Sequence, residues 1–290
     1  MKIKNWLLVL LIALCLGAFF GYRTLDRMRT DTQEPEITMV ETIPQISVAD
    51  PKDVLLQGIT ARDKKDGDVT ASLVVESVSL LDSTGRLTVK YAAFDSAGNV
   101  AKAQREAVYT DYVSPKFTAK GPLAYPYGYD FDVLSTVGAT DVIDGEIQHR
   151  VRATSLDEKS IGEMGIHEVE FKVNNSLGDT ATLVLPVEVY DSRQFEASLS
   201  LSAYLVYLQQ GANFKAASYL NQFTLMGESV NLSRGLPENY ALKTRGTVDT
   251  QTPGVYPVEF RVTYTEKHES RPDLDREFTG YSKLIVVVEG

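Results

Sequence analysis

Apolar and polar residues alternate in three separate stretches of this chain. Within each stretch the apolar positions are spaced by two: Leu87, Val89 and Tyr91; then Val169, Phe171 and Val173; then Tyr256, Val258, Phe260 and Val262. A period of two is typical of an antiparallel strand with one buried face. The pattern therefore predicts that the body of the protein is built from half-buried β-strands.

Turn-forming residues follow the first two alternating stretches. The segments DSAGN (95–99) and NNSLGD (174–179) are rich in Asp, Asn and Gly, which favour tight reversals of the chain. Apolar segments come next at 107–109 and 183–189, and a third, LIVVV, lies at 284–288. Each alternating stretch is thus predicted to pair with a closing strand in a β-hairpin.

The sequence also repeats itself with a period near 80 residues. The segment GITARDKKDGDVT (58–70) is echoed by VGATDVIDGEIQ (137–148). The third copy lacks this acidic element and carries a long polar hairpin tip at 266–277 instead. A repeat of this length predicts tandem domains, with boundaries at 34–112, 113–191 and 192–290, behind an N-terminal segment at 1–33.

The motif Asp-x-x-Asp-Gly-Asp, a Gly-led alternating strand and then Asp-x-x-Gly-Asn together resemble the bacterial Ig-like domains of cell-surface and pesticidal crystal proteins. The combination is also similar to hyalin repeats. The resemblance is best in the first copy, weaker in the second, and limited in the third to the hairpin that begins at Pro253. It implies an all-β fold of tandem immunoglobulin-like β-sandwich domains, and such modules serve as stalks, spacers and adhesins.

Residues 6–22, from Trp6 to Tyr22, form an uncharged apolar run preceded by Lys2 and Lys4. A helix of this length spans roughly 25 Å, close to the thickness of a bilayer core. We expect a single transmembrane helix that holds the domains outside the cell. Secretion after signal-peptide cleavage is the alternative, although Leu16 is bulky for a cleavage site. Lipid attachment at Cys15 is a further alternative, which Leu14 disfavours.

The charge and the cysteine content limit the possible partners and the cellular location of the protein. Beyond residue 31 the chain has 24 basic and 37 acidic residues, a net charge of −13, so it should repel nucleic acid and anionic lipid. Cys15 is the only cysteine of the sequence, so disulfides cannot hold the domains together and each needs its own core. A bacterial surface is the expected location.

The acidic loops contain the candidate metal-binding residues. Oxygen-rich side chains suit Ca²⁺, which takes six to eight oxygen ligands. The alternative is that these side chains satisfy turn backbones and bind no ion. The candidate ligands of the first and second repeats are Asp63, Asp66, Asp68, Asp95 and Asn99, and Asp141, Asp144, Glu146, Asn175 and Asp179.

Sequence signatures of catalysis are missing. The chain has no Gly-x-Ser-x-Gly elbow and no phosphate-binding glycine loop, and its three histidines are scattered. We therefore expect a non-catalytic, membrane-anchored protein for adhesion or interaction, whose partner is a protein or glycan at the cell surface. The alternative is a structural stalk subunit of a bacterial envelope complex.

Overall fold

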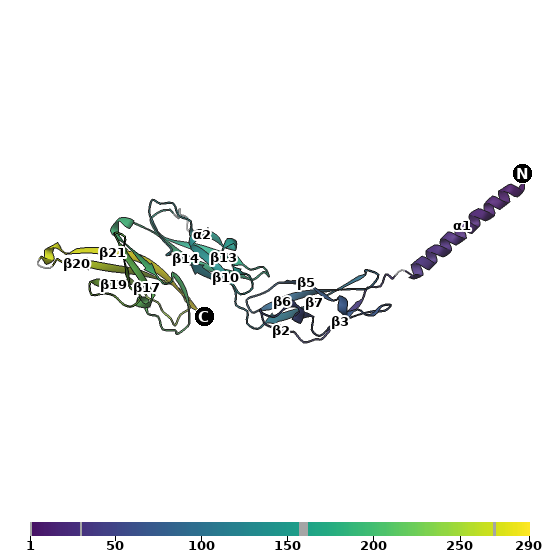
Figure 1. Ribbon diagram of the computed structural model, residues 1–290, viewed down its shortest axis with the longest axis horizontal. Coiled ribbons are helices and arrows are strands. Elements are labelled where there is room, and N and C mark those ends of the chain that lie inside the picture. The colour runs from purple at the N-terminus through teal and green to yellow at the C-terminus, as the bar shows by residue number, and fades with distance from the viewer. Residues whose placement is uncertain (1, 30, 157–161, 269–270) are drawn as a thin grey trace. The chain divides into compact units, whose positions relative to one another are not determined.

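Strands dominate the structure. The computed structural model describes residues 2–29, 31–156, 162–268 and 271–290, and it divides into two units, 1–112 and 113–290. The chain is a mostly-β protein with several β-sheet domains (Figure 1). This confirms the predicted fold class at that level, whereas the domain boundaries at 34–112, 113–191 and 192–290 stay predictions.

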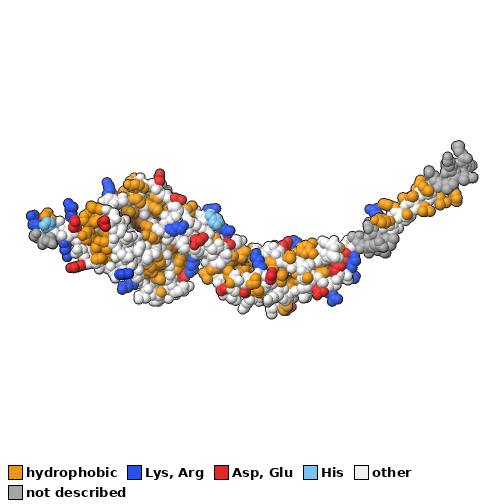
Figure 2. All heavy atoms as spheres, viewed as in Figure 1, with side chains coloured by type: hydrophobic (Ala, Val, Ile, Leu, Met, Phe, Trp, Pro, Cys, Tyr) orange, Lys and Arg blue, Asp and Glu red, His pale blue; other side chains and the backbone are white. Residues whose placement is uncertain are grey.

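One long helix, α1 (Lys2–Arg29), begins the first unit. The apolar side chains that the structure describes in its middle part are exposed, including Trp6 and Phe20 at 70% and 60%, and Figure 2 shows hydrophobic atoms along the visible face of this part. Among the residues that the structure describes, no helix is both long enough and apolar enough to cross a membrane. The membrane anchor predicted over residues 6–22 is therefore not supported. Met1 and Thr30 of the predicted N-terminal segment lie outside the described residues.

The remainder of the first unit forms two sheets. One has the strand order β1-β3-β4 and the other β2-β7-β6-β5, with β2 parallel to β7 and the other pairs antiparallel. Short 3-10 turns, η1 (Lys52–Leu56) and η2 (Thr70–Ser72), connect them. The strands are β1 (Glu36–Met39), β2 (Gln45–Ile46), β3 (Ile59–Asp63), β4 (Gly67–Asp68), β5 (Val74–Ser79), β6 (Arg86–Phe94) and β7 (Val100–Tyr109).

The predicted alternation is confirmed in β6. Leu87, Val89 and Tyr91 are buried, and Arg86 and Lys90 between and beside them are exposed. The Tyr91 hydroxyl donates a hydrogen bond to the Leu55 carbonyl at 2.9 Å and accepts one from Arg105 Nε at 3.0 Å. The hydroxyl of this buried side chain thus has hydrogen-bond partners, as a buried hydroxyl requires.

The second unit begins with the same strand plan. Its first seven strands form the sheets β11-β10-β8 and β12-β13-β14-β9. Two short helical segments, α2 (Val133–Thr136) and η3 (Gln148–Arg150), lie between strands. The strands are β8 (Lys116–Ala119), β9 (Ala124–Pro126), β10 (Val137–Asp141), β11 (Gly145–Glu146), β12 (Arg152–Ser155), β13 (Gly165–Asn174) and β14 (Thr180–Tyr190).

The last seven strands of the second unit join into one sheet, β18-β17-β15-β21-β20-β19, with β16 also paired to β21. Three 3-10 turns, η4 (Ser192–Gln194), η5 (Ala216–Tyr219) and η6 (Pro272–Leu274), interrupt this part. The strands are β15 (Ala197–Leu201), β16 (Leu205–Gln209), β17 (Leu220–Leu225), β18 (Glu228–Asn231), β19 (Tyr240–Arg245), β20 (Gly254–Glu266) and β21 (Arg276–Glu289).

One connectivity therefore occurs three times along the described chain. In each copy the first strand pairs with the third, the third with the fourth, and the second runs parallel to the seventh. In the third copy the first strand also pairs with the seventh, which joins the two sheets along one edge. The sequence repeat thus corresponds to a repeat of strand pairing.

Strand β21 is buried on both faces. Leu284, Val286 and Val288 pack in the core of the third copy, whereas Ile285 belongs to the core of the second copy. A strand covered on two sides reads as a continuous apolar run, which accounts for the sequence LIVVV. Because a fully buried Ile or Val stabilises a fold by roughly 1.5–3 kcal/mol, this strand ties the second and third copies into one unit.

Candidate functional site

Asp63 ends strand β3 at the first acidic loop. Its side chain is 2% exposed, and its Oδ1 accepts hydrogen bonds from the N–H groups of Lys65 and Asp66 at 2.7 and 2.8 Å. The hydrogen bonds from Asp66 and Lys65 lower the pKa of Asp63, although burial and the charge of Asp95 act in the opposite direction. The carboxylate is therefore ionised at neutral pH, while its Oδ2 has no hydrogen-bond partner.

Asp95 follows strand β6 at the start of the hairpin turn. Its two oxygens accept hydrogen bonds from Asn99, from the backbone N–H at 2.8 Å and from Nδ2 at 2.6 Å. Burial raises the pKa of Asp95, but the hydrogen bonds from Asn99 outweigh this effect and leave the pKa below its ordinary value. Asn99 thus acts by holding a charged Asp95 in place.

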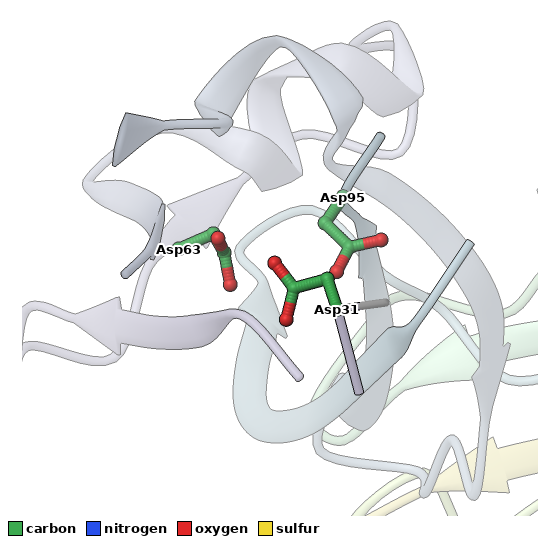
Figure 3. Close-up of side chains that lie close together, drawn as sticks. All are labelled: Asp31, Asp63 and Asp95. Atoms are coloured by element: carbon green, nitrogen blue, oxygen red, sulfur yellow. The ribbon is translucent and has the colours of Figure 1, made fainter. Parts of the chain in front are cut away.

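Asp31 joins these two residues from the segment before β1. Its side chain is 8% exposed, and its Oδ1 accepts a hydrogen bond from the Gln33 N–H at 3.1 Å. Asn99 Nδ2 donates to the Asp31 carbonyl at 3.3 Å. Carboxylate oxygens of Asp31, Asp63 and Asp95 all lie within 4.8 Å of one another (Figure 3).

Two oxygens of this three-carboxylate group, Asp31 Oδ2 and Asp63 Oδ2, are buried without a hydrogen-bond donor. Lys65 Nζ lies 4.0 Å from Asp31 Oδ2, and its side chain is 59% exposed. Buried carboxylate oxygens normally have partners, because burial without one is costly. A hard cation is the partner that three clustered carboxylates suit best.

The other acidic candidates of the first repeat, Asp66 and Asp68, accept hydrogen bonds within turns. Both oxygens of Asp66 accept hydrogen bonds from Ser96, from N–H at 2.7 Å and from Oγ at 2.9 Å, which joins the acidic loop to the hairpin turn. Asp68 accepts a hydrogen bond from the Thr70 N–H at 2.9 Å. Hydrogen bonding by Thr70 lowers the pKa of Asp68. Both residues therefore stabilise turns.

The second repeat has an amide where the first has Asp95. Asn175 Nδ2 donates a hydrogen bond to Asp141 Oδ2 at 3.3 Å, and Asp141 Oδ1 accepts from Ile143 and Asp144 N–H groups. Both carboxylate oxygens of Asp141 therefore have donors. Asn175 Oδ1 in turn accepts hydrogen bonds from the N–H groups of three residues that follow it, including Asp179 at 3.1 Å.

The remaining candidates of the second repeat are also engaged in turns or exposed. Asp144 binds Ser176 through both oxygens and pairs with Arg150 at 2.9 Å. Asp179 Oδ1 accepts from the Thr180 N–H, and Glu146 is exposed in β11. Within the described part of the chain, the three-carboxylate group of the first repeat is the cluster with metal-ligand spacing.

Sequence reasoning found Asp63 and Asp95 but missed Asp31. The two repeats align Pro35 with Pro115 and Asp31 with Asp111, so the linker position was visible as a repeated Asp-x-x-x-Pro. Asp111, which stands before the second copy, accepts hydrogen bonds from Ser47 Oγ at 2.6 Å and the Val48 N–H at 2.8 Å, both within the first unit. The linker aspartate thus contacts different partners in the two copies.

In the third copy a two-residue turn replaces the acidic loop. Leu225 pairs with Glu228, and Met226 and Gly227 between them both have positive φ, 54° and 89°. Two residues with positive φ are the geometry of a type I′ turn. This turn carries no carboxylate to bind an ion.

Comparison with known proteins gives distant similarities. No protein-family model matches the chain. An uncharacterized 81.3 kDa protein of Acholeplasma phage L2 is 30% identical over 109 residues, which is 37% of this chain and 14% of that protein.

Among solved structures, the M60 catalytic domain with the CBM51-1 and CBM51-2 domains from Clostridium perfringens ZmpB matches with 11% identity and a TM-score of 0.25, over 90% of this chain and 43% of that one. The protocadherin GammaB4 extracellular domain matches with 10% identity and a TM-score of 0.18, over 88% and 44%. The chain thus spans less than half of each of these structures. At such scores the likeness is a distant one.

Proposed function

We propose that this chain is an exported, non-catalytic binding protein made of immunoglobulin-like domains, in which the β20–β21 hairpin is the binding element. Its partner is a protein or glycan at the cell surface. Export is part of the proposal because the apolar run at residues 6–22 follows Lys2 and Lys4 in the manner of an export signal. The observation that carries the binding role is the projection of the hairpin beyond its neighbours.

The hairpin extends past the strands beside it. On one side β19 pairs with β20 from Glu259 to Tyr264, and on the other β15 pairs with β21 at Gly280 and Tyr281. The paired strands continue outward to Glu266 and Arg276 (Figure 1). Loops and tips on a rigid scaffold commonly carry binding residues.

The described residues of the tip are polar and bond to one another. Asp275 Oδ1 accepts a hydrogen bond from the His268 N–H at 2.8 Å, and Arg271 pairs with Asp273 at 2.9 Å. Residues 269 and 270 of the predicted tip lie outside the described residues. A tip with both charge signs suits a polar partner.

Aromatic rings line the base of the hairpin. Tyr240 and Tyr264 have ring centroids 5.0 Å apart, and Tyr264 and Phe278 are 6.4 Å apart. All three side chains are half-buried, so part of each ring faces solvent. Aromatic faces beside a polar tip are typical of protein and carbohydrate contacts.

The alternative role is a structural stalk. It is favoured by the way β21 locks the second and third copies together, because such a joint resists bending. Under this alternative the hairpin tip would be dispensable, and the chain would copurify with an envelope complex.

A hairpin replacement separates these roles. Because Glu266 and Arg276 are paired across the hairpin, residues 267–275 can be replaced by Asn-Gly, which closes a two-residue turn. The matched control is Met226→Asn, which creates Asn-Gly at the β17–β18 turn of the same domain. Both variants and the unaltered full chain, purified in detergent, are applied to immobilised collagen, immobilised fibronectin and a printed glycan panel.

Binding of the full chain and of Met226→Asn to one of these probes, with at least a tenfold loss in the tip replacement, is the expected result. Protease added to intact expressing cells should also degrade the chain. The binding proposal is wrong if the full chain binds none of the probes, or if the tip replacement binds as well as the full chain. Protection of the chain from external protease would overturn the exported location.

A further inference from the structure

We propose that Asp31, Asp63 and Asp95 form a Ca²⁺ site that belongs to the first repeat and is lost in the second. The site is independent of the binding role of the hairpin. It uses two of the residues predicted from the acidic loops and one residue from the linker before the first strand.

The burial and hydrogen bonding of Asp63 are a second observation, besides the clustering of carboxylates, that points to a bound cation. Its side chain is 98% buried by area, and one of its oxygens is fully occupied by two backbone N–H groups while the other, Oδ2, has no donor. Figure 3 shows this carboxylate beside those of Asp31 and Asp95. A bound cation would supply the missing partner and would offset the repulsion among three like charges.

The spacing of the oxygens fits calcium. Calcium–oxygen distances of about 2.3–2.6 Å place two ligands on opposite sides of the ion up to about 4.6–5.2 Å apart. The three carboxylate oxygens lie within 4.8 Å of one another, so they can surround the ion with little movement. Magnesium requires distances of about 2.0–2.1 Å and octahedral order, and the group contains no His or Cys that would favour zinc.

Solvent reaches the site from one side. A surface hollow lined by Gln33, Glu36, Arg62, Asp63 and Lys64, among other residues, adjoins the group at Asp63. Water molecules from this side can complete a shell of six to eight oxygens. The exposed Lys65 side chain, 4.0 Å from Asp31 Oδ2, can turn toward solvent when the ion binds.

The second repeat shows how the same loop is satisfied without an ion. Asn175 stands at the position of Asp95, and its amide donates to Asp141 Oδ2, the atom that corresponds to the unpartnered Asp63 Oδ2. Asp111, the counterpart of Asp31, accepts hydrogen bonds from Ser47 and Val48. The second repeat thus lacks two of the three ligands. Asn175 replaces the carboxylate of Asp95, and Asp111 bonds to Ser47 and Val48 instead of joining the cluster.

Calcium binding would hold the linker against the first domain. Asp31 comes from the segment before β1, whereas Asp63 ends β3 and Asp95 follows β6, two strands of different sheets. An ion shared by all three would cross-link these segments.

Titration of the purified full chain with CaCl₂ tests the site. Calorimetry should give one ion per chain, with Asp63→Asn and Asp95→Asn each weakening binding at least tenfold. The matched control is Asp141→Asn in the second repeat, which should bind as the unaltered chain does. Parallel titration with MgCl₂ should show binding at least tenfold weaker than with CaCl₂.

Melting temperatures show whether a variant that fails to bind Ca²⁺ is still folded. In EDTA, Asp63→Asn and Asp95→Asn should still unfold cooperatively but melt below the unaltered chain, because the hydrogen bonds that lower the pKa of each carboxyl stabilise its charged form. At a Ca²⁺ concentration of about 100 Kd, the unaltered chain should gain about 5 °C or more and the two variants should not. The site is refuted if the full chain binds no Ca²⁺ up to about 10 mM, if Asp63→Asn binds as tightly as the unaltered chain, or if Mg²⁺ binds equally well.

Discussion

Gly85, at the turn into β6, is a residue whose side chain is excluded by the backbone of a neighbouring strand. Its φ is +82°, and a Cβ atom there would lie 2.4 Å from the carbonyl oxygen of Tyr109. The Tyr109 N–H also donates to the Gly85 carbonyl at 2.9 Å, so the two strands meet closely at this point. Gly98 has a similar φ of +88°, but a Cβ atom there would meet nothing within 4 Å.

The two glycines provide a matched pair of substitutions. Gly98→Ala should cost about 1 kcal/mol, the usual penalty for a non-glycine residue in the left-handed region. Gly85→Ala should cost at least about 3 kcal/mol, because strain from the backbone clash adds to that penalty. Urea unfolding of the two variants measures the difference, and equal losses would show that β7 shifts to make room.

At the scale of elements, the period-two pattern located the central strands because it depends on local burial alone. Val169, Phe171 and Val173 of β13, and Val258, Phe260 and Val262 of β20, are buried as the alternation predicts. The sequence also placed Asp63 and Asp95 in turns. It did not identify Asp31 as their neighbour, because the repeated Asp-x-x-x-Pro marks the linker position but not the path of the linker across the end of the sandwich.

Strand β21 shows a second limit of sequence reasoning. The apolar run of β21 predicted that the strand is buried. It did not predict the contacts that the polar side chains of β21 make with β14. Lys283 is 1% exposed and lies 3.2 Å from Glu188 Oε2 of β14, and the Tyr281 hydroxyl donates to the same oxygen at 2.6 Å. Burial, with Glu188 nearby, raises the pKa of Tyr281, so its hydroxyl stays a donor.

Removing Glu188 should therefore destabilise the second unit strongly. Glu188→Ala removes the carboxylate that lies 3.2 Å from the ammonium of the buried Lys283. The expected loss is about 3 kcal/mol, measured by denaturant unfolding. Glu228→Ala, at an exposed position on β18, is the control and should change stability by less than about 0.5 kcal/mol. A loss below about 1 kcal/mol for Glu188→Ala would mean that water replaces the carboxylate.

At the scale of the whole molecule, the three copies of one strand plan form two units. The first copy lies in the unit 1–112, and the second and third share the unit 113–290. Ile285 and the Lys116–Glu289 ion pair at 2.6 Å join the last two copies. Domains linked by a shared apolar core are expected to unfold together.

Scanning calorimetry of the full chain should accordingly give two transitions and not three. Gly85→Ala should lower the temperature of one transition, and Glu188→Ala that of the other. Movement of both transitions by either variant would contradict the division into two units.

The double burial of β21 also orders events during synthesis. The first unit contains every strand that its two sheets need by residue 109, so it can fold while the ribosome is still translating the rest. In the second unit β15, β16 and β20 all pair with β21, the last strand of that unit. Until that strand emerges, these three strands have open edges, and the core of the second copy lacks Ile285. The topology therefore requires that a chaperone protects these edges or that β21 pairs with them rapidly.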